Sequence, residues 1–203
     1  MKIFMRDIIV IGAPVGGGAA LIRLAASLPP DLRASVFVVL HTAENPLLLA
    51  DVLNAPGRMR ATEAVEGEPI QSSRIYVARH GKHLVLEAEK IRLTSDPEEN
   101  NHRPSIDTLF RSAASAHKTR VVGVILVHAR EDGILGLQAI RQNGGRTVSH
   151  RNEQMPDKPC HPETREELVH DHLEIEKIAP RLIAYVNSAN GNGSSARTDE
   201  VRR

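Results

Sequence analysis

Seven residues near the N-terminus, Gly12 to Gly18 (GAPVGGG), could bind or react with a ligand. They follow a short apolar run and precede a stretch with helical spacing. Such a turn lets the backbone approach a ligand closely and presents the free N–H groups of a helix start. As a dinucleotide-binding fingerprint it fails, because Pro14 replaces the second required glycine. A tight structural turn and a phosphate-binding or nucleotide-binding turn remain open alternatives.

A histidine and an aspartate follow two further apolar runs. His41 comes directly after VFVVL, and Asp132 comes shortly after VVGVILV. The carboxyl ends of parallel strands meet at one edge of a sheet, so His41 would emerge beside the glycine turn. It could act there as a general base, with Asp132 orienting its imidazole. The alternatives are a hydrogen-bonded structural histidine, and an aspartate that caps a helix beginning near Ile134.

Other reactive side chains are less well placed for chemistry. The hydroxyls expected nearest the same edge belong to Thr42, Ser105 and Ser149, and none of them lies on the glycine turn. Cys160 and His161 are adjacent, and neighbouring residues rarely face each other, so we interpret the thiol as a bystander.

The segment His170-Asp171-His172 could chelate a metal from a strand, but no second ligand group has zinc spacing, so we expect no metal site. We expect the scattered arginines in the motifs to serve packing and hydrogen bonding: Arg103, Arg111, Arg130 and Arg146.

The apolar pattern predicts the elements that position these residues. Continuous β-branched runs are typical of strands buried on both faces of a parallel sheet: Ile8 to Ile11, Val36 to Leu40 and Val121 to Val127. A shorter strand is expected over Arg146 to Ser149. Helical spacing covers Gly18 to Leu28, Pro46 to Leu53, Ile106 to His117, Ile134 to Gln142, and Ile175 to Val186 with an interruption at Pro180. Alternating stretches indicate a hairpin or meander attached to the sheet: Ile70 to Val77, His83 to Glu87 and Lys90 to Thr94.

These elements predict an α/β fold, a three-layer sandwich with a mostly parallel, doubly wound sheet and ligands at the carboxyl ends of its strands. We expect one domain over residues 1–187 and a disordered tail over 188–203. Lys plus Arg number 26 and Asp plus Glu 25, so nothing in the net charge attracts nucleic acid. One cysteine and short apolar runs favour a soluble cytoplasmic protein without membrane insertion. The oligomeric state stays open.

Taken in order, the motifs resemble the catalytic domain of CheB-type protein-glutamate methylesterases. They are GAPVGGG, VVLH ending at His41, EGEPIQSSRIYVARHGKHL, ENNHRPSIDTLFRSAA and GVILVHAREDGILGLQAIRQNGGRT, over about Asp7 to Val148. The most specific pieces are HRPSIDTLFRSAA and D-G-x-x-G-L-x-A-I-x-x-x-G-G-x-T. The resemblance implies a serine hydrolase that removes methyl esters from chemoreceptor glutamates and deamidates glutamines through a Ser-His-Asp triad, with no cofactor.

The resemblance assigns His41 and Asp132 to the family histidine and aspartate, but Pro14 to the serine. Proline has no hydroxyl, so no acyl adduct could form there. Two neighbouring motifs also depart from the family, His128 to Gly133 in place of G-M-G-x-D-G, and Met155 to Leu168 in place of a V-F-G-M-P-like loop.

We therefore expect a catalytically impaired domain that acts by binding a methyl-accepting chemoreceptor, another signalling protein or a second copy of itself. The alternative is an active carboxyl-ester hydrolase with a different nucleophile. The sequence begins at the first strand of the catalytic domain, so regulation by a phosphorylated receiver domain in cis is not expected.

Overall fold

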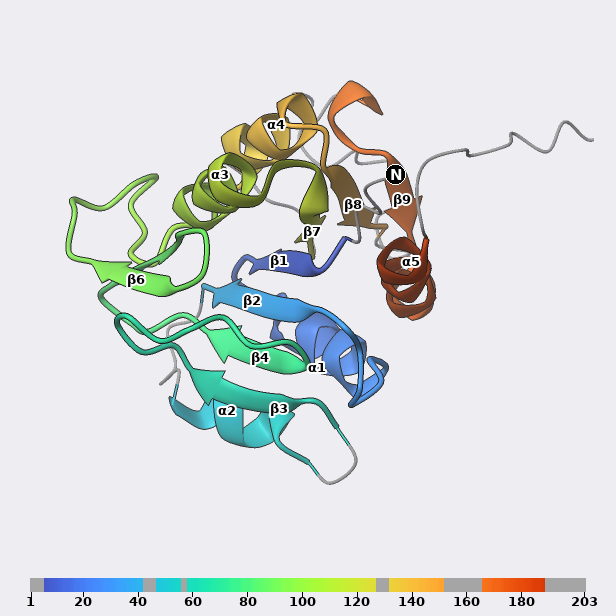
Figure 1. Cartoon of the computed structure of the whole chain (residues 1–203), viewed down its shortest axis with the longest axis horizontal. Coiled ribbons are helices and arrows are strands. Elements are labelled where there is room, and N and C mark those ends of the chain that lie inside the picture. The colour runs from blue at the N-terminus through green and yellow to red at the C-terminus, as the bar shows by residue number, and fades with distance from the viewer. Residues whose placement is uncertain (1–5, 42–46, 56–57, 127–131, 152–165, 189–203) are drawn as a thin grey trace, which may run out of the picture.

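The computed structural model describes residues 6–41, 47–55, 58–126, 132–151 and 166–188 (Figure 1). Seven parallel strands form one sheet in the order β3-β4-β2-β1-β7-β8-β9. They are β1 Ile8–Ala13, β2 Ser35–Leu40, β3 Arg60–Glu63, β4 Arg74–Val77, β7 Val121–Ile125, β8 Arg146–His150 and β9 Asp171–Leu173. The chain first forms β2, β3 and β4 on one side of β1 and then returns to form β7, β8 and β9 on the other side. Ligands bind α/β sheets where the strand order reverses in this way.

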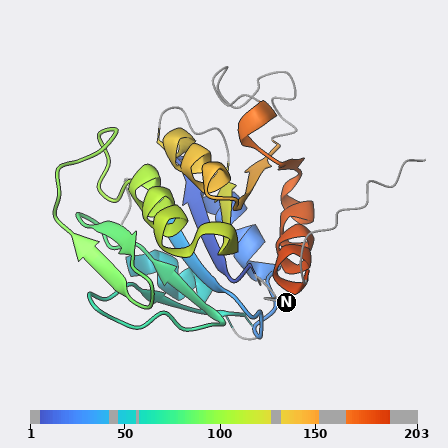
Figure 2. The same ribbon diagram turned by 45° about the horizontal axis from the view of Figure 1, so that its top comes forward.

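Helices cover both faces of the sheet (Figures 1 and 2). One layer contains α1 Gly18–Ala26, α2 Leu47–Leu53 and α5 Ile175–Asn187, and the other contains α3 Ile106–His117 and α4 Ile134–Gln142. An antiparallel hairpin of β5 His83–Leu86 and β6 Ile91–Thr94 packs beside α3. Two short 3-10 turns occur at Lys118–Arg120 and Glu166–Leu168. The predicted three-layer α/β sandwich is confirmed.

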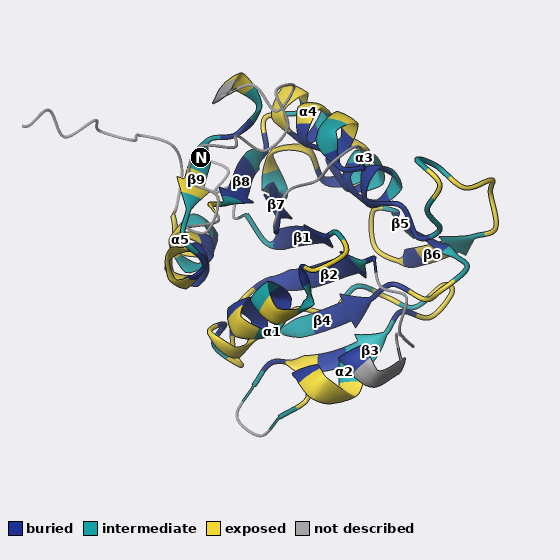
Figure 3. Ribbon diagram, turned by 180° about the vertical axis from the view of Figure 1, so that it is seen from behind, coloured by how far each residue is buried: buried dark blue, intermediate teal, exposed yellow. Residues whose placement is uncertain are grey.

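Alternate side chains of each central strand pack into two hydrophobic cores on opposite faces of the sheet. In β1, Ile9 and Ile11 pack with α1, α2 and α5, while Ile8 and Val10 pack with α3 and α4. Each of the four is at most 2% exposed. Burial on both faces explains why the run is continuously apolar instead of alternating. Figure 3 shows this buried sheet between two helical layers whose outer faces are exposed.

Two expectations about single elements are wrong, and two strands were not expected. The stretch Ile70 to Val77 supplies β4 of the main sheet and not a hairpin strand, because Arg74–Val77 pairs in parallel with β2. The edge strands β3 and β9 were not predicted from the sequence. Helix α5 continues through Pro180, since buried Ile178, Ala179 and Leu182 hold it against the sheet despite one lost hydrogen bond.

The last described residue is Ser188, at the end of α5. It donates its N–H to the Ala184 carbonyl at 2.9 Å and its hydroxyl to the Tyr185 carbonyl. Residues 189–203, most of the predicted disordered tail, lie outside the described residues. None of the helices in the described ranges is long and apolar enough to cross a membrane.

Candidate functional site

The sheet register brings the glycine turn and His41 to the same edge. Ala13 and Leu40 are paired at the carboxyl ends of β1 and β2. One residue further on, the His41 N–H donates to the Ala13 carbonyl at 2.8 Å. On the other side of β1, the Leu126 N–H donates to the Gly12 carbonyl at 2.9 Å, so the chain leaving β7 starts from this edge as well.

The turn after β1 is tight and has no reactive side chain. The Pro14 carbonyl accepts the Gly17 N–H at 2.8 Å, and Gly16 has a φ of +91°, which a residue with a side chain rarely adopts. A Cβ at Gly17 would lie 3.0 Å from the Pro14 carbonyl oxygen, whereas a Cβ at Gly16 or Gly18 would meet nothing within 4 Å. The half-buried Pro14 presents a ring without hydroxyl or N–H beside this open space.

The structure brings His41 and Asp132 together. Nε2 of His41 lies 3.2 Å from Oδ2 of Asp132, and only 6% and 3% of the two side chains are exposed. The two atoms are close enough to pair, although no well-aligned hydrogen bond joins them. Such contacts are often loose in the absence of a ligand. In this orientation Asp132 can fix the imidazole, and Nδ1 is the ring nitrogen left for a proton donor.

Asp132 also caps α3. Its Oδ1 accepts the Ser105 hydroxyl at 2.8 Å and the Asp107 N–H at 2.9 Å, and its Oδ2 accepts the Ile106 N–H at 2.7 Å. A carboxylate at a helix N-terminus satisfies free N–H groups and is stabilised by the helix dipole. The cap serves α3, which precedes Asp132 in the chain. The alternative of a cap for α4 is wrong, because Gly133 occupies that position.

The hydrogen bonds keep Asp132 ionised. Burial alone would raise the pKa of this carboxyl, but the adjacent His41 imidazole and the N–H groups of Asp107 and Ile106 outweigh burial, and the pKa lies below its usual value. At neutral pH the site therefore combines an ionised carboxylate with a buried imidazole.

A second buried carboxylate, Asp107, joins the starts of α3 and α4. Its Oδ1 accepts the Gly136 N–H at 2.6 Å, and its Oδ2 accepts the Asn100 amide at 3.0 Å. The same amide donates to Oδ1 of Asp132 at 3.1 Å, so Asn100 bridges the two carboxylates. Burial raises the pKa of Asp107, with a contribution from the negative charge of Asp132. Asp107, not Asp132, is thus the first of the two to take up a proton.

Sequence reasoning missed His102, whose ring stacks on that of His41. The ring centroids are 3.7 Å apart and the planes differ by 17°. His102 lies on a loop in which Asn100 and Asn101 have left-handed backbones, at φ 53° and 60°. Glu99 ties this loop to α3 by accepting two hydrogen bonds of 2.6 Å from Arg111. The motif HRPSIDTLF was the available signal, since it contains both His102 and Asp107.

Packing presses the start of α3 onto this edge. A Cβ at Gly12 would lie 2.5 Å from Cγ2 of Ile106, and a Cβ at Gly133 would lie 2.7 Å from Cδ1 of Ile125. Real Cβ atoms do not approach so closely, so these positions need glycine. Ile106 can therefore lie over the ends of β1 and β7, and its N–H reaches Asp132.

The other predicted residues lie apart from this site or have fixed partners. Ser105 donates its hydroxyl to Asp132 and accepts the Thr108 N–H at 3.3 Å. Arg103 donates to the Asp96 carbonyl at 3.1 Å. Thr42, His128, Arg130, Cys160 and His161 lie outside the described residues.

His170 and His172 bind separate partners on β8. Nδ1 of His170 lies 2.8 Å from Oγ1 of Thr147, and Nδ1 of His172 lies 2.6 Å from Oγ of Ser149. In the part of the chain that the structure describes, no group of three or more His, Cys, Asp or Glu side chains could hold a metal ion.

Known proteins match this architecture and these motifs. The family model for the CheB methylesterase matches residues 9–182. A protein named protein-glutamate methylesterase/protein-glutamine glutaminase 2 from Methanosarcina acetivorans is 31% identical over 195 residues, which cover 89% of this chain and 54% of the relative. A protein of the same name from Anaeromyxobacter dehalogenans is 38% identical over 144 residues, covering 70% of this chain and 42% of the relative.

The chain thus spans about half the length of these curated relatives. Among solved structures, the Thermotoga maritima CheB methylesterase catalytic domain matches with a TM-score of 0.81 and 27% identity, covering 87% of this chain and 97% of that one. With its fold, its motifs and most of its length accounted for, the chain belongs to the CheB methylesterase family.

Proposed function

We propose that this chain is a CheB-like signalling domain that recognises its target but hydrolyses methyl esters poorly or not at all. The observation that carries the proposal is Pro14, at the position that the resemblance assigns to the serine nucleophile. An imidazole oriented by a carboxylate activates a hydroxyl only if one is within reach. The described turn after β1 offers no such group.

Asp132 has a structural role that does not depend on catalysis. Its carboxylate accepts hydrogen bonds from Ser105, Ile106 and Asp107, and these hold α3 on the sheet. Losing it would leave buried N–H groups unsatisfied, which costs about 1–3 kcal/mol each. The presence of Asp132 is therefore compatible with a domain that only binds.

Two exposed apolar side chains near the candidate site support a binding role. Val15 lies on the glycine turn and is 74% exposed, and Leu135 lies in the first turn of α4 and is 55% exposed. Both elements follow strands that end at the site edge, β1 and β7. Apolar contacts of this kind contribute to docking of a protein segment. The proposed target is a methyl-accepting chemoreceptor or another signalling protein that carries glutamates in a helical or extended segment.

The direct test measures hydrolysis and binding on the same preparation. We expect no methanol release from methylated chemoreceptor above the background without protein, together with saturable binding of the receptor's cytoplasmic fragment in a calorimetric titration. Val15→Asp should weaken that binding, while Val52→Asp on α2, also exposed, should leave it unchanged. Methanol release by the unmodified chain would contradict the proposal, as would failure to bind any receptor fragment.

One observation favours a second candidate, a hydrolase that uses Ser149. Its Oγ lies 2.6 Å from Nδ1 of His172, across the paired strands β8 and β9. A histidine at that distance can take the hydroxyl proton as Oγ attacks an ester carbonyl. Against this role, Ser149 is only 1% exposed, which restricts access of an ester.

We expect a fluorophosphonate probe to leave Ser149 unlabelled. The side chain is buried, and its contact with His172 is explained by a structural hydrogen bond. Mass spectrometry of the treated protein checks this. Labelling that disappears in Ser149→Ala and His172→Gln, but persists in Ser27→Ala on the outer surface, would establish the second candidate instead.

A further inference from the structure

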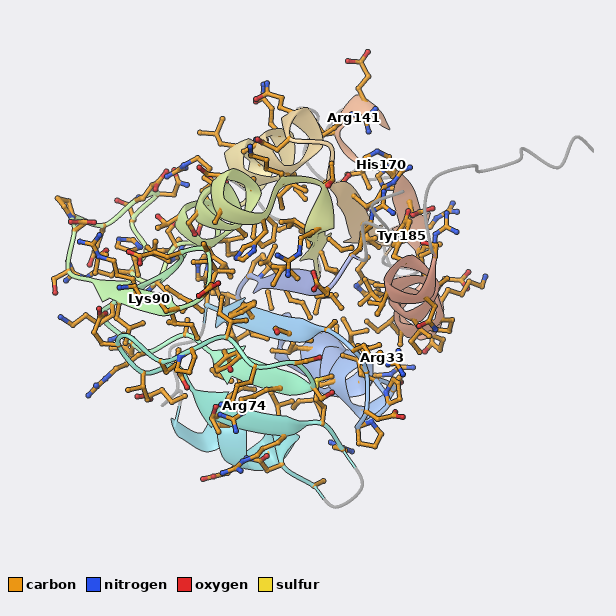
Figure 4. All side chains as sticks on the ribbon, in the orientation of Figure 1. Arg33, Arg74, Lys90, Arg141, His170 and Tyr185 are labelled. Carbon is orange, nitrogen blue, oxygen red and sulfur yellow. The ribbon has the colours of Figure 1, made fainter. Side chains whose placement is uncertain are left out.

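Three arginines and a histidine gather at the edge of the sheet opposite the candidate site. Arg6 precedes β1, Arg146 is the first residue of β8, Arg141 lies in the last turn of α4, and His170 precedes β9. Parallel strands begin at one edge and end at the other, so this basic cluster is separate from Pro14 and its neighbours. Figure 4 labels Arg141 and His170 beside β8 and β9, with Tyr185 of α5 nearby.

One direct contact joins two members of the basic cluster, and other contacts fix the surroundings of the rest. Nη1 of Arg141 lies 3.3 Å from Nε2 of His170, and Nδ1 of His170 contacts Thr147, the residue after Arg146. The guanidinium carbon of Arg6 lies 5.8 Å from the centre of the Tyr185 ring.

The pKa of His170 is also affected by the charges of the three arginines. Burial is the largest cause that lowers the pKa of His170, to about 4, and the charges of Arg146, Arg141 and Arg6 lower it further. His170 is therefore neutral at pH 7. Burial also lowers the pKa of Arg6, again with a contribution from Arg146. The cluster thus holds several like charges that repel one another.

No carboxylate neutralises these charges within the described ranges. Six other arginines form ion pairs there: Arg23, Arg79, Arg92, Arg111, Arg120 and Arg181. Among the described residues, Arg6, Arg141 and Arg146 have no ion-pair partner, and Nε of Arg6 is buried without a hydrogen-bond partner. Asp171 is close to His170, but Arg181 and Tyr185 already bind its carboxylate.

We propose that this cluster binds a phosphate group, either free or carried by a phosphorylated partner protein. Guanidinium groups bind tetrahedral oxyanions through paired N–H donors, and several phosphate oxygens can serve several arginines at once. A bound dianion also relieves the repulsion among Arg6, Arg141 and Arg146. Neutral His170 adds a ring nitrogen, and its protonation is favoured when the anion is present.

The first test is calorimetric titration with inorganic phosphate at pH 7, against chloride at matched ionic strength. Arg146→Gln and Arg6→Gln should each weaken binding by roughly tenfold or more, as expected for loss of one charge-assisted contact. Arg33→Gln is the matched control, because Arg33 is an exposed arginine beside the start of β2 and outside the cluster. Equal loss in all three variants, or no binding, would overturn the proposal.

A second measurement does not depend on variants that could fold poorly. The NMR titration of His170 in the unmodified protein, in sulfate as a stand-in dianion, should give a pKa raised by about one unit or more over that in chloride. No difference between the salts would count against an anion site. A phosphoserine peptide compared with free phosphate then identifies the source: equal affinity supports free phosphate, and much tighter peptide binding supports a phosphorylated partner.

Discussion

Replacing Pro14 by serine is expected to raise methanol release from methylated chemoreceptor by at least about a hundredfold over the unmodified chain, the lower range for a positioned general base. The residue leaves β1 directly beside His41, whose N–H bonds to the Ala13 carbonyl. His41 lies 3.2 Å from Asp132, and the adjoining turn has room at Gly16 and Gly18. A hydroxyl at position 14 supplies the one group that this constellation lacks.

Two further variants distinguish the effect of the added hydroxyl on activity from the effect of removing the proline ring. Pro14→Ala frees the backbone in the same way but adds no nucleophile, so it should remain as inactive as the unmodified chain. Adding His41→Ala to Pro14→Ser should abolish the gain, because the hydroxyl then lacks its base. If Pro14→Ser stays silent although it folds, the pocket itself has diverged and the assignment of His41 and Asp132 as a latent catalytic pair fails.

Asp132→Asn is expected to lower the free energy of unfolding at pH 7 by about 2–4 kcal/mol, because an amide puts a donor where a carboxylate oxygen accepted one. Only 3% of this side chain is exposed, and its neighbours Ile106, Asp107 and Asn100 all donate to it. Urea denaturation checks this value.

The contribution of Asp132 to the free energy of unfolding should depend on pH. The folded pKa of Asp132 is below its usual value, so the ionised carboxylate stabilises the fold above its unfolded pKa of about 3.9. This contribution is lost as the pH falls through the pKa of the folded state, so the stability difference between the unmodified chain and Asp132→Asn should shrink at those low pH values.

Asp107→Asn is the control variant for this prediction. Its pKa is raised, so ionised Asp107 costs stability at pH 7, and removing its charge should cost much less than removing that of Asp132. A larger loss for Asp107→Asn would contradict this account.

The sequence alone was enough to predict the sheet centre and the helices of both layers. Continuous apolar runs predicted β1, β2 and β7, because a strand buried on both faces has no position where a polar side chain would face water. The helices α3 and α4 have the predicted bounds. Edge strands give no such signal. β3 reads RATE and β9 reads DHL, and each has a neighbouring strand on one side only, so polar residues are tolerated.

For the site, residue order determined that Pro14 and His41 leave neighbouring strands, since short apolar runs around a helix predict a parallel pair. The sequence also determined the missing hydroxyl, because no fold can supply one to proline. Only the tertiary structure decided the partners of Asp132. The start of α3 lies 25 residues or more earlier in the chain, and it reaches Asp132 because Gly12 and Gly133 allow close packing. The stacking of His102 on His41 and the contact of Arg141 with His170 likewise join distant segments of the chain, which a local sequence pattern does not predict.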